Sequence, residues 1–577
     1  MHQQVAGEQP SPSPAARRQK QKPSSGLLSS FTSVWFSDNT PDEPSAEDLE
    51  AEKETVQCIN QCNLRAIILD TKNLQADSLI YLLKALILAS VRPKEKEAVP
   101  FDEKLAIFCL DLVTAITYLN QERIIFLWVL VYEHFAGLLG GATSATFLTE
   151  RAVSNLLFLC QKLGGSDFGE QLIKSLQLLL KLNPAVTASL ADLITTGTSR
   201  ILHAHPRLLR SPVAWPTLLS LIRFSTDYPN SSIVAFKALN GLILADKALA
   251  PEQRLIITDN FFSVFNTIKA FARSKACPPS LAIEAMECLY SLFCRLPDVV
   301  ELVPMATIHE ESKHTGATPP PANEAEARAL WGWSRYWVPA LQDVGEICKE
   351  PRLEVRHYAI VILQRALLSP ALARAPPQAC FSCFHQARPL SSASAREREG
   401  LTTGGRAVIF PLLKELLVPR PTARAEAAAL EETRQRASAL ASKIFLQYMS
   451  NIMGSDGFED LWMLLLDYTE QYMNTNSELL AEAVTESLKN TLLVMSASNV
   501  LQPSQGHGQQ QQQQEEGIWE KTWRKIDAFC PSVKHEFHTV LAKTNPPPDA
   551  APASTASSSV GEVTATPQQS AEHPQQP

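Results

Sequence analysis

The sequence predicts an all-α fold of the HEAT/armadillo-like α-solenoid class, in which helix pairs stack one after another. Three observations favour this class. Apolar residues recur at three- and four-residue steps from about residue 50 to about residue 545, as amphipathic helices require. No stretch alternates apolar and polar residues in the manner of a β-strand. Helix pairs recur about every 40 residues, which is the spacing of HEAT and armadillo arrays.

The clearest pair lies between residues 330 and 370. In its second helix, Val355, Ala359 and Ile362 share one face because they follow helical spacing. Pro351 lies in the turn between the two helices, where its missing N–H group costs little. Two amphipathic helices joined by a short turn cannot each bury an apolar stripe alone. They must therefore stack on each other and on neighbouring pairs.

The same periodicity predicts helices along most of the chain, separated by proline, glycine and asparagine residues typical of helix ends. In chain order, the predicted helices span residues 49–69, 75–90, 102–119, 121–139, 147–163, 168–182, 186–203, 213–225, 230–247, 252–273, 279–295, 324–348, 353–369, 406–418, 424–451, 457–473, 477–496, 517–529 and 532–543.

Shifts in composition divide the chain. The predicted parts are a disordered tail at 1–45, a helical repeat region at 46–304, a polar linker at 305–323, a second repeat region at 324–543 and a disordered tail at 544–577. The second repeat region contains a loop at 371–404 and a glutamine-rich insert at 502–516. Both interruptions, like the tails, lack the apolar residues that folding requires.

The length, net charge and cysteine usage of the chain exclude some classes of protein. A chain of 577 residues exceeds one compact core, so several domains or one extended array are expected. A net charge of −8 provides no overall basic field for nucleic acid. The polar, proline-rich start MHQQVAGEQPSPSP does not resemble a signal peptide. Scattered cysteines within apolar runs indicate reduced thiols in a cytoplasmic protein.

One segment requires a membrane test. Residues 124–131 read IIFLWVLV, but Glu133 and His134 interrupt the apolar run. The run is far shorter than the ~20 residues that a membrane-spanning helix needs. The pattern therefore favours a buried core helix, with an interfacial helix and a membrane span as the open alternatives.

The parts of a catalytic or metal site are not evident. Cys380 and Cys383 are separated by two residues, with His385 nearby, but a structural zinc site needs a second pair of ligands at suitable spacing. We find no Gly-x-Ser-x-Gly elbow, glycine-rich phosphate loop or His-Glu-x-x-His helix. The sequence therefore predicts no catalytic residue, no metal and no cofactor.

Basic residues on two helices are the remaining candidate contact feature. The interpretation without a binding role is a solvent-exposed helix face, since Glu432 and Arg436 form an ordinary i,i+4 pair. The alternative is recruitment to acidic lipid or to a protein partner. The residues predicted for such contacts are Arg352, Arg356, Arg365, Arg434, Arg436 and Lys443.

Several helix blocks resemble a known family. LWGWSRYWVPALQDV, RLEVRHYAIVILQRALL, EETRQRASALASKIFLQY, LWMLLLDYTEQYM, AEAVTESLKNTLLVM and WEKTWRKID are similar to the C-terminal region of the Golgi-specific brefeldin-A-resistance family. AEDLEAEKETVQCINQCN and FLTERAVSNLLFL resemble the preceding part of that family. The blocks cover most of residues 46–543 in family order.

Members of this family are large Arf guanine-nucleotide exchange factors, in which three downstream homology regions follow the exchange domain. The resemblance implies that residues 46–304 are the end of the first and the second of these regions, and that residues 324–543 are the third. The family's exchange domain uses a Phe-Arg-Leu-Pro-Gly-Glu segment, which this sequence lacks. The resemblance therefore carries over no catalytic glutamate, and whether this chain counts as an enzyme stays open.

The resemblance also implies partners and a location. We expect a cytoplasmic, peripheral membrane protein of Golgi vesicle transport, recruited by acidic lipids or a small GTPase of the Arf pathway, with homodimerisation only through regions outside this chain. Two alternatives remain: a generic HEAT-like scaffold or adaptor in trafficking or transport, and a chain with exchange activity of its own.

Overall fold

The computed structural model describes residues 46–91, 101–315, 323–372, 376–384, 407–418, 424–475, 477–502 and 517–544. Within these ranges every regular element is a helix and no strand occurs, which confirms the predicted all-α class. The predicted tails up to residue 45 and from residue 545, most of the loop at 371–404, His385 and most of the glutamine-rich insert lie outside the described residues.

The described residues form two compact units, divided after Ser455. The first unit contains the helices α2 (Ala46–Gln61), α3 (Leu64–Asp70), α4 (Ala76–Ser90), α5 (Glu103–Leu119), α6 (Ile124–Gly140), α7 (Phe147–Leu163), α8 (Gly169–Ser175), α9 (Pro184–Ala204), α10 (Trp215–Phe224), α11 (Pro229–Lys247), α12 (Thr258–Arg273), α13 (Pro279–Phe293), α14 (Leu296–Glu301), α15 (Met305–Thr315), α16 (Glu324–Gly332), α17 (Val338–Ile347), α18 (Leu353–Leu367), α19 (Pro377–Phe384), α20 (Ile409–Leu417) and α21 (Arg424–Ile452). The second contains α22 (Phe458–Met473), α23 (Glu478–Ala497), α24 (Ile518–Phe529) and α25 (Pro531–Thr544).

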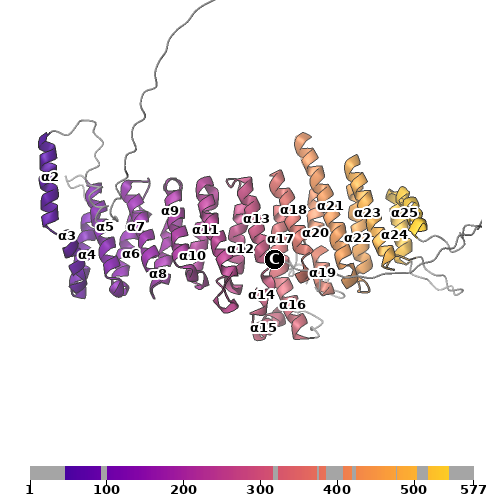
Figure 1. The fold of residues 1–577 in the computed structure, drawn as a ribbon, viewed down its shortest axis with the longest axis horizontal. Coiled ribbons are helices and arrows are strands. Elements are labelled where there is room, and N and C mark those ends of the chain that lie inside the picture. Colours follow the sequence, from indigo (N-terminus) through magenta and orange to yellow (C-terminus); the bar gives the residue numbers. More distant parts are fainter. Residues whose placement is uncertain are drawn as a thin grey trace, which may run out of the picture. The chain divides into compact units, whose positions relative to one another are not determined.

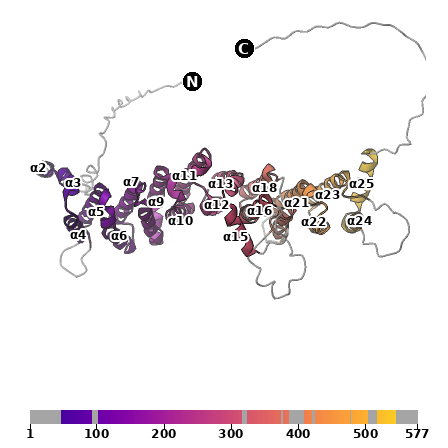
Figure 2. The ribbon, with the colours of Figure 1, turned by 90° about the horizontal axis from the view of Figure 1, so that it is seen from below.

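In the first unit the helices pack as pairs in two layers (Figures 1 and 2). One layer consists of α5, α7, α9, α11, α13, α18 and α21, each packed against the next. The other consists of α4, α6, α10, α12, α17 and α20, with the short 3-10 helix η3 (Leu176–Lys181) between α6 and α10. Stacked helix pairs in two layers are the α-solenoid arrangement, so the predicted architecture is confirmed.

Local sequence explains where many helices begin. The side chain of Asp102 accepts hydrogen bonds from the N–H groups of Lys104 and Leu105 at the start of α5. Thr146 and Asn183 cap α7 and α9 in the same way. These side chains satisfy N–H groups that have no partner within the helix. The predicted range 147–163 therefore coincides with α7.

The structure also departs from several predicted helices. The predicted helix 49–69 is divided at Asn63, whose left-handed φ of 43° separates α2 from α3. The predicted helix 324–348 contains a π-helical turn at Trp333–Trp337 between α16 and α17. The predicted linker at 305–323 contains α15, and Ile308 within it is fully buried. This short helix was missed because most of its residues are polar.

The π-helical turn accommodates a crowded aromatic cluster. Trp333 and Trp337 stack with ring centroids 6.5 Å apart, and Tyr336 stacks on Phe262 of α12 at 5.5 Å. A Cβ atom at Gly332 would lie only 2.6 Å from Cζ3 of Trp337. The turn thus brings large rings close to the backbone, which explains why glycine occupies position 332.

In the second unit, α24 is joined to α22 by side-chain hydrogen bonds. Trp462 Nε1 donates to Thr522 Oγ1 over 2.8 Å, and Lys525 pairs with Asp467. Trp523 packs on Phe537 of α25 with centroids 5.1 Å apart. This unit thus has an aromatic core of its own.

Candidate functional site

The six predicted contact residues lie on or beside α18 and α21. Arg352, at the start of α18, donates to the backbone oxygens of Ala272 (2.7 Å) and Cys277 (3.1 Å), and its Nε donates to Glu350 over 3.0 Å. The two carbonyl groups lie at and beyond the C-terminal end of α12. Arg352 therefore ties α18 to α12 by satisfying carbonyls that have no helical partner.

Arg356 is only 7% exposed. Its guanidinium donates to Thr433 Oγ1 of α21 over 2.9 Å and to the backbone oxygens of Glu350 (2.8 Å) and Pro351 (3.1 Å). The Thr433 hydroxyl itself donates to Ala429 O. Because its hydrogen is used there, Thr433 accepts from Arg356. A buried arginine with these bonds holds α18 onto α21 and turns away from solvent.

The structure leaves three of the six side chains accessible. Arg365 is 41% exposed, pairs with Glu287 of α13 over 2.5 Å and lies 4.1 Å above the ring of Tyr290. Arg436 is 45% exposed and pairs with Glu432 over 2.8 Å. Lys443 is exposed on α21, one heptad after Arg436. Arg434 is half-buried and donates to Leu416 O of α20.

The structure thus brings the six residues to two adjacent helices and uses three of them, Arg352, Arg356 and Arg434, for internal hydrogen bonds. Their assignment as lipid or partner contacts stays a prediction. An arginine at a helix surface position can point inward only if a neighbour supplies acceptors, and some of these acceptors, such as Thr433 and Ala272, come from distant parts of the chain. Sequence alone could not separate the internally bonded arginines from the accessible cations.

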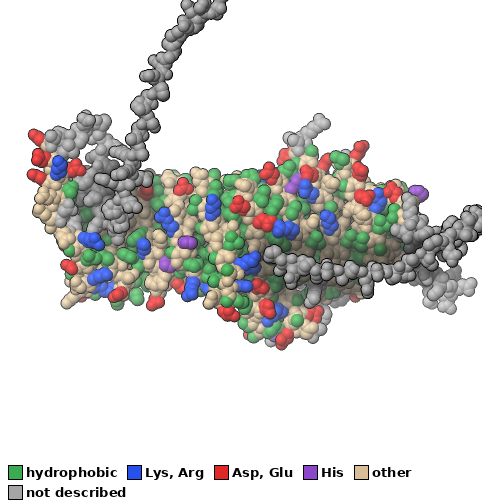
Figure 3. Space-filling model, in the orientation of Figure 1, with side chains coloured by type: hydrophobic (Ala, Val, Ile, Leu, Met, Phe, Trp, Pro, Cys, Tyr) green, Lys and Arg blue, Asp and Glu red, His purple; other side chains and the backbone are tan. Residues whose placement is uncertain are grey.

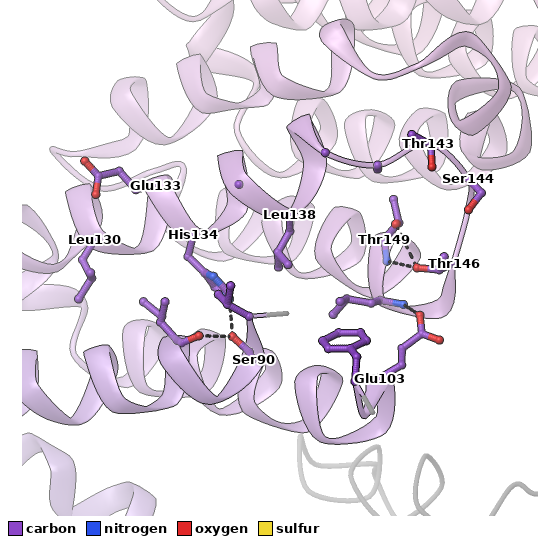
Figure 4. A pocket seen from close by; sticks show the side chains of 17 residues that line it. Ser90, Glu103, Leu130, Glu133, His134, Leu138, Thr143, Ser144, Thr146 and Thr149 are labelled. Carbon is purple, nitrogen blue, oxygen red and sulfur yellow. Dashed lines mark hydrogen bonds between the residues drawn. The ribbon is translucent and has the colours of Figure 1, made fainter. Parts of the chain in front are cut away.

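A cavity of about 870 Å³ lies between α4, α6 and the start of α7 (Figure 4). His134 of α6 and Ser90 of α4 point toward each other there, with Nε2 3.1 Å from Oγ. Ser90 Oγ also donates to Ile87 O, so His134 must donate its Nε2 hydrogen to Ser90. Burial lowers the pKa of His134 to about 4. The imidazole is therefore neutral near pH 7 and cannot act as a base toward Ser90 in this arrangement.

The cysteine pair considered for zinc is buried in α19. Burial raises the pKa of the Cys380 thiol to about 11, and burial also raises the pKa of the Cys383 thiol well above its ordinary value. Zinc binding requires thiolates, so this environment favours protonated thiols. Cys58 lies exposed on α2, and Cys62 lies exposed in the turn that follows this helix. Among the described residues, no group of three or more His, Cys, Asp or Glu side chains is arranged to hold a metal ion.

The apolar helix α6 differs from its prediction on one side. Leu127, Val131 and Phe135 are buried as a core helix requires, but Ile125 and Phe126 are 65% and 70% exposed. Among the described residues, Gln121–Gly140 is the one segment long and apolar enough to cross a membrane by length and composition, and 39% of its apolar window is buried. Ile125, Phe126 and Val129 thus form an exposed apolar ridge on α6, and the sequence signal for it is that these apolar residues lie outside the buried face.

The chain resembles known proteins along most of its length. Residues 337–533 match the family described as "GBF1-like, tetratrico peptide repeat region". The chain is 30% identical to the ARF guanine-nucleotide exchange factor GNL1 of Arabidopsis thaliana, over 89% of this chain and 32% of that protein. It is 28% identical to the factor GNOM of the same plant, over 89% of this chain and 33% of that protein.

A third relative, from Caenorhabditis elegans, is a homolog of the Golgi-specific brefeldin A-resistance guanine nucleotide exchange factor 1. It is 36% identical over 31% of this chain and 8% of its own length. The chain thus spans about a third of the length of the plant relatives that it matches. The resemblance inferred from the helix blocks is confirmed: the chain is homologous to ARF guanine-nucleotide exchange factors and is similar to a GBF1-type C-terminal region.

Proposed function

We propose that this chain is the regulatory and targeting region of an Arf guanine-nucleotide exchange factor, and that it acts at the cytoplasmic surface of Golgi membranes. The observation that carries the proposal is the alignment of 89% of the chain with one third of two exchange factors. Nucleotide exchange would then be performed by another part of the protein. Within the proposal, residues 46–304 are the end of the first and the second downstream homology region, and residues 324–543 are the third.

The two layers of the first unit offer different contact surfaces. In the layer of α4 and α6, five large apolar side chains are at least 64% exposed: Tyr81, Leu88, Ile125, Phe126 and Val129. Exposed apolar side chains on helices suit insertion into the interface of a bilayer. In the layer of α18 and α21, the accessible cations Arg365, Arg436 and Lys443 suit an acidic partner such as a small GTPase. Weak contacts of both kinds would reinforce each other on one chain.

Sedimentation with vesicles of phosphatidylcholine and phosphatidylserine tests membrane recruitment. We expect the whole chain to sediment with the vesicles, and Phe126→Ser to weaken the association because it removes a 70% exposed ring from α6. Leu244→Ser is the matched control, since Leu244 is 58% exposed on α11 in the other layer. Equal binding by both variants would rule out the α6 surface. A chain that binds neither vesicles nor any Golgi GTPase would contradict recruitment itself.

Release of a fluorescent nucleotide from an Arf GTPase separates recruitment from catalysis. We expect the isolated chain to leave the release rate unchanged, because its sequence lacks the Phe-Arg-Leu-Pro-Gly-Glu segment that the family's exchange domain uses. Acceleration by the isolated chain would instead support the alternative that this region has exchange activity of its own.

A further inference from the structure

A second cavity, of about 380 Å³, opens on the layer formed by α7, α9 and α11. Five of its lining residues come from α9, and four of these are polar: Thr196, Ser199, Arg200 and His203. Their spacing of i, i+3, i+4 and i+7 places all four on one face of that helix. Figure 3 shows histidine and Lys or Arg side chains over α9 on the face that it draws.

Close packing of α9 on α7 sets the position of this face. Gly197 lies so near Leu157 that a Cβ atom would approach its Cδ1 to 2.5 Å. On the other side, Ala238 of α11 lines the cavity with a small side chain. The small side chain of Ala238 therefore leaves room for a ligand beside the polar face of α9.

The four polar side chains of α9 in this cavity have no hydrogen-bond partner among the described residues. Ser199 is 9% exposed, and its Oγ has no hydrogen-bond partner among the described residues. Thr196, Arg200 and His203 likewise make no side-chain hydrogen bond or ion pair within the described part of the chain. A buried hydroxyl without a partner is costly and is normally satisfied by a ligand or water.

The charge around the cavity is positive. No aspartate or glutamate lines it, whereas Lys162 and Lys237 are exposed on α7 and α11 next to lining residues. Asp192, one turn before Thr196 on α9, accepts a hydrogen bond from Ser231 at 2.5 Å. A cation would find no carboxylate in this cavity, but an anion would find a guanidinium and two hydroxyl donors.

We propose that this cavity binds a phosphate monoester, carried by a soluble metabolite or by a lipid headgroup. The phosphate oxygens accept hydrogen bonds in several directions. A bidentate guanidinium together with nearby hydroxyl groups supplies donors in such an arrangement. Arg200 binds two phosphate oxygens, Ser199 supplies its free hydroxyl and His203 closes the outer end of the cavity. The site lies in the opposite layer from the exposed ridge of α6, so it does not depend on the proposed membrane recruitment.

Calorimetric titration of the whole chain with inorganic phosphate, against chloride at equal ionic strength, tests the proposal. We expect saturable binding that Arg200→Gln weakens at least tenfold. Arg223→Gln, which alters an exposed arginine of α10 in the other layer, should bind phosphate as the unaltered chain does. Ser199→Ala should weaken binding while leaving the thermal stability of the free chain unchanged or higher, because it removes an unpaired buried hydroxyl.

Vesicles distinguish the source of the phosphate. Phosphatidic acid carries a phosphate monoester, whereas phosphatidylserine is anionic without one. Arg200-dependent preference for phosphatidic acid vesicles would identify a lipid headgroup, and binding of inorganic phosphate without that preference would identify a soluble ligand. Absence of saturable phosphate binding, or equal weakening by Arg200→Gln and Arg223→Gln, would overturn the proposal. Sedimentation with phosphatidylserine vesicles tests recruitment separately.

Discussion

Replacing Arg356 by methionine tests whether this arginine is structural or a contact residue. The substitution keeps most of the side-chain volume but removes hydrogen bonds to Thr433 Oγ1 and to the backbone oxygens of Glu350 and Pro351. Hydrogen bonds that involve a charged group contribute about 1.5–3 kcal/mol each, and part of that is recovered because the charge no longer has to be buried. We therefore expect the free energy of unfolding to fall by roughly 2–4 kcal/mol.

Urea unfolding and hydrogen exchange of the amides in α18 and α21 would measure this loss. Hydrogen exchange is informative because a helical array can open locally, and the amides of the opened helices then exchange faster. Arg436→Met is the matched control: its exposed i,i+4 pair with Glu432 should contribute only about 0.3–0.5 kcal/mol. If Arg356→Met were as stable as Arg436→Met, or lost partner binding at full stability, the structural interpretation of Arg356 would be refuted.

Three further predictions concern the burial or exposure of individual side chains. Asp111→Asn should lower stability by about 1.5–3 kcal/mol in urea unfolding, because Asp111 accepts two hydrogen bonds from Arg151 at 2.8 Å; an unchanged midpoint would contradict this. Burial lowers the pKa of His134 from 6.5 to about 4, so between these values the unfolded chain binds a proton that the folded chain does not. Stability should therefore fall by roughly 3 kcal/mol as the pH drops through that window, and His134→Gln should flatten the profile. Maleimide labelling followed by mass spectrometry should modify three exposed cysteines before all others, and early labelling of a buried one would be unexpected. The exposed cysteines are Cys58, Cys62 and Cys294.

Much of the fold was predictable because the helices carry local signals. Thr146, Asn183 and Pro184 mark helix starts through hydrogen bonding and backbone geometry that depend only on neighbouring residues. The misses occurred where distant residues decide. α15 is mostly polar, yet Ile308 is buried and Glu311 accepts a hydrogen bond from Trp331 of α16. No periodicity within residues 305–323 indicates those contacts.

The amino-acid sequence by itself determined the class of fold, the approximate limits of most helices and the family, since these depend on spacing and on residue identity along the chain. Only the tertiary structure decided which side chains face solvent. Arg356 and Arg436 lie on helix surfaces of similar composition, but Thr433 and the backbone of residues 350–351 draw the first inward, while Glu432 leaves the second exposed. The physical reason is that a guanidinium can be buried only where the fold supplies acceptors for it, and for Arg356 these come from α21 and from the turn before α18.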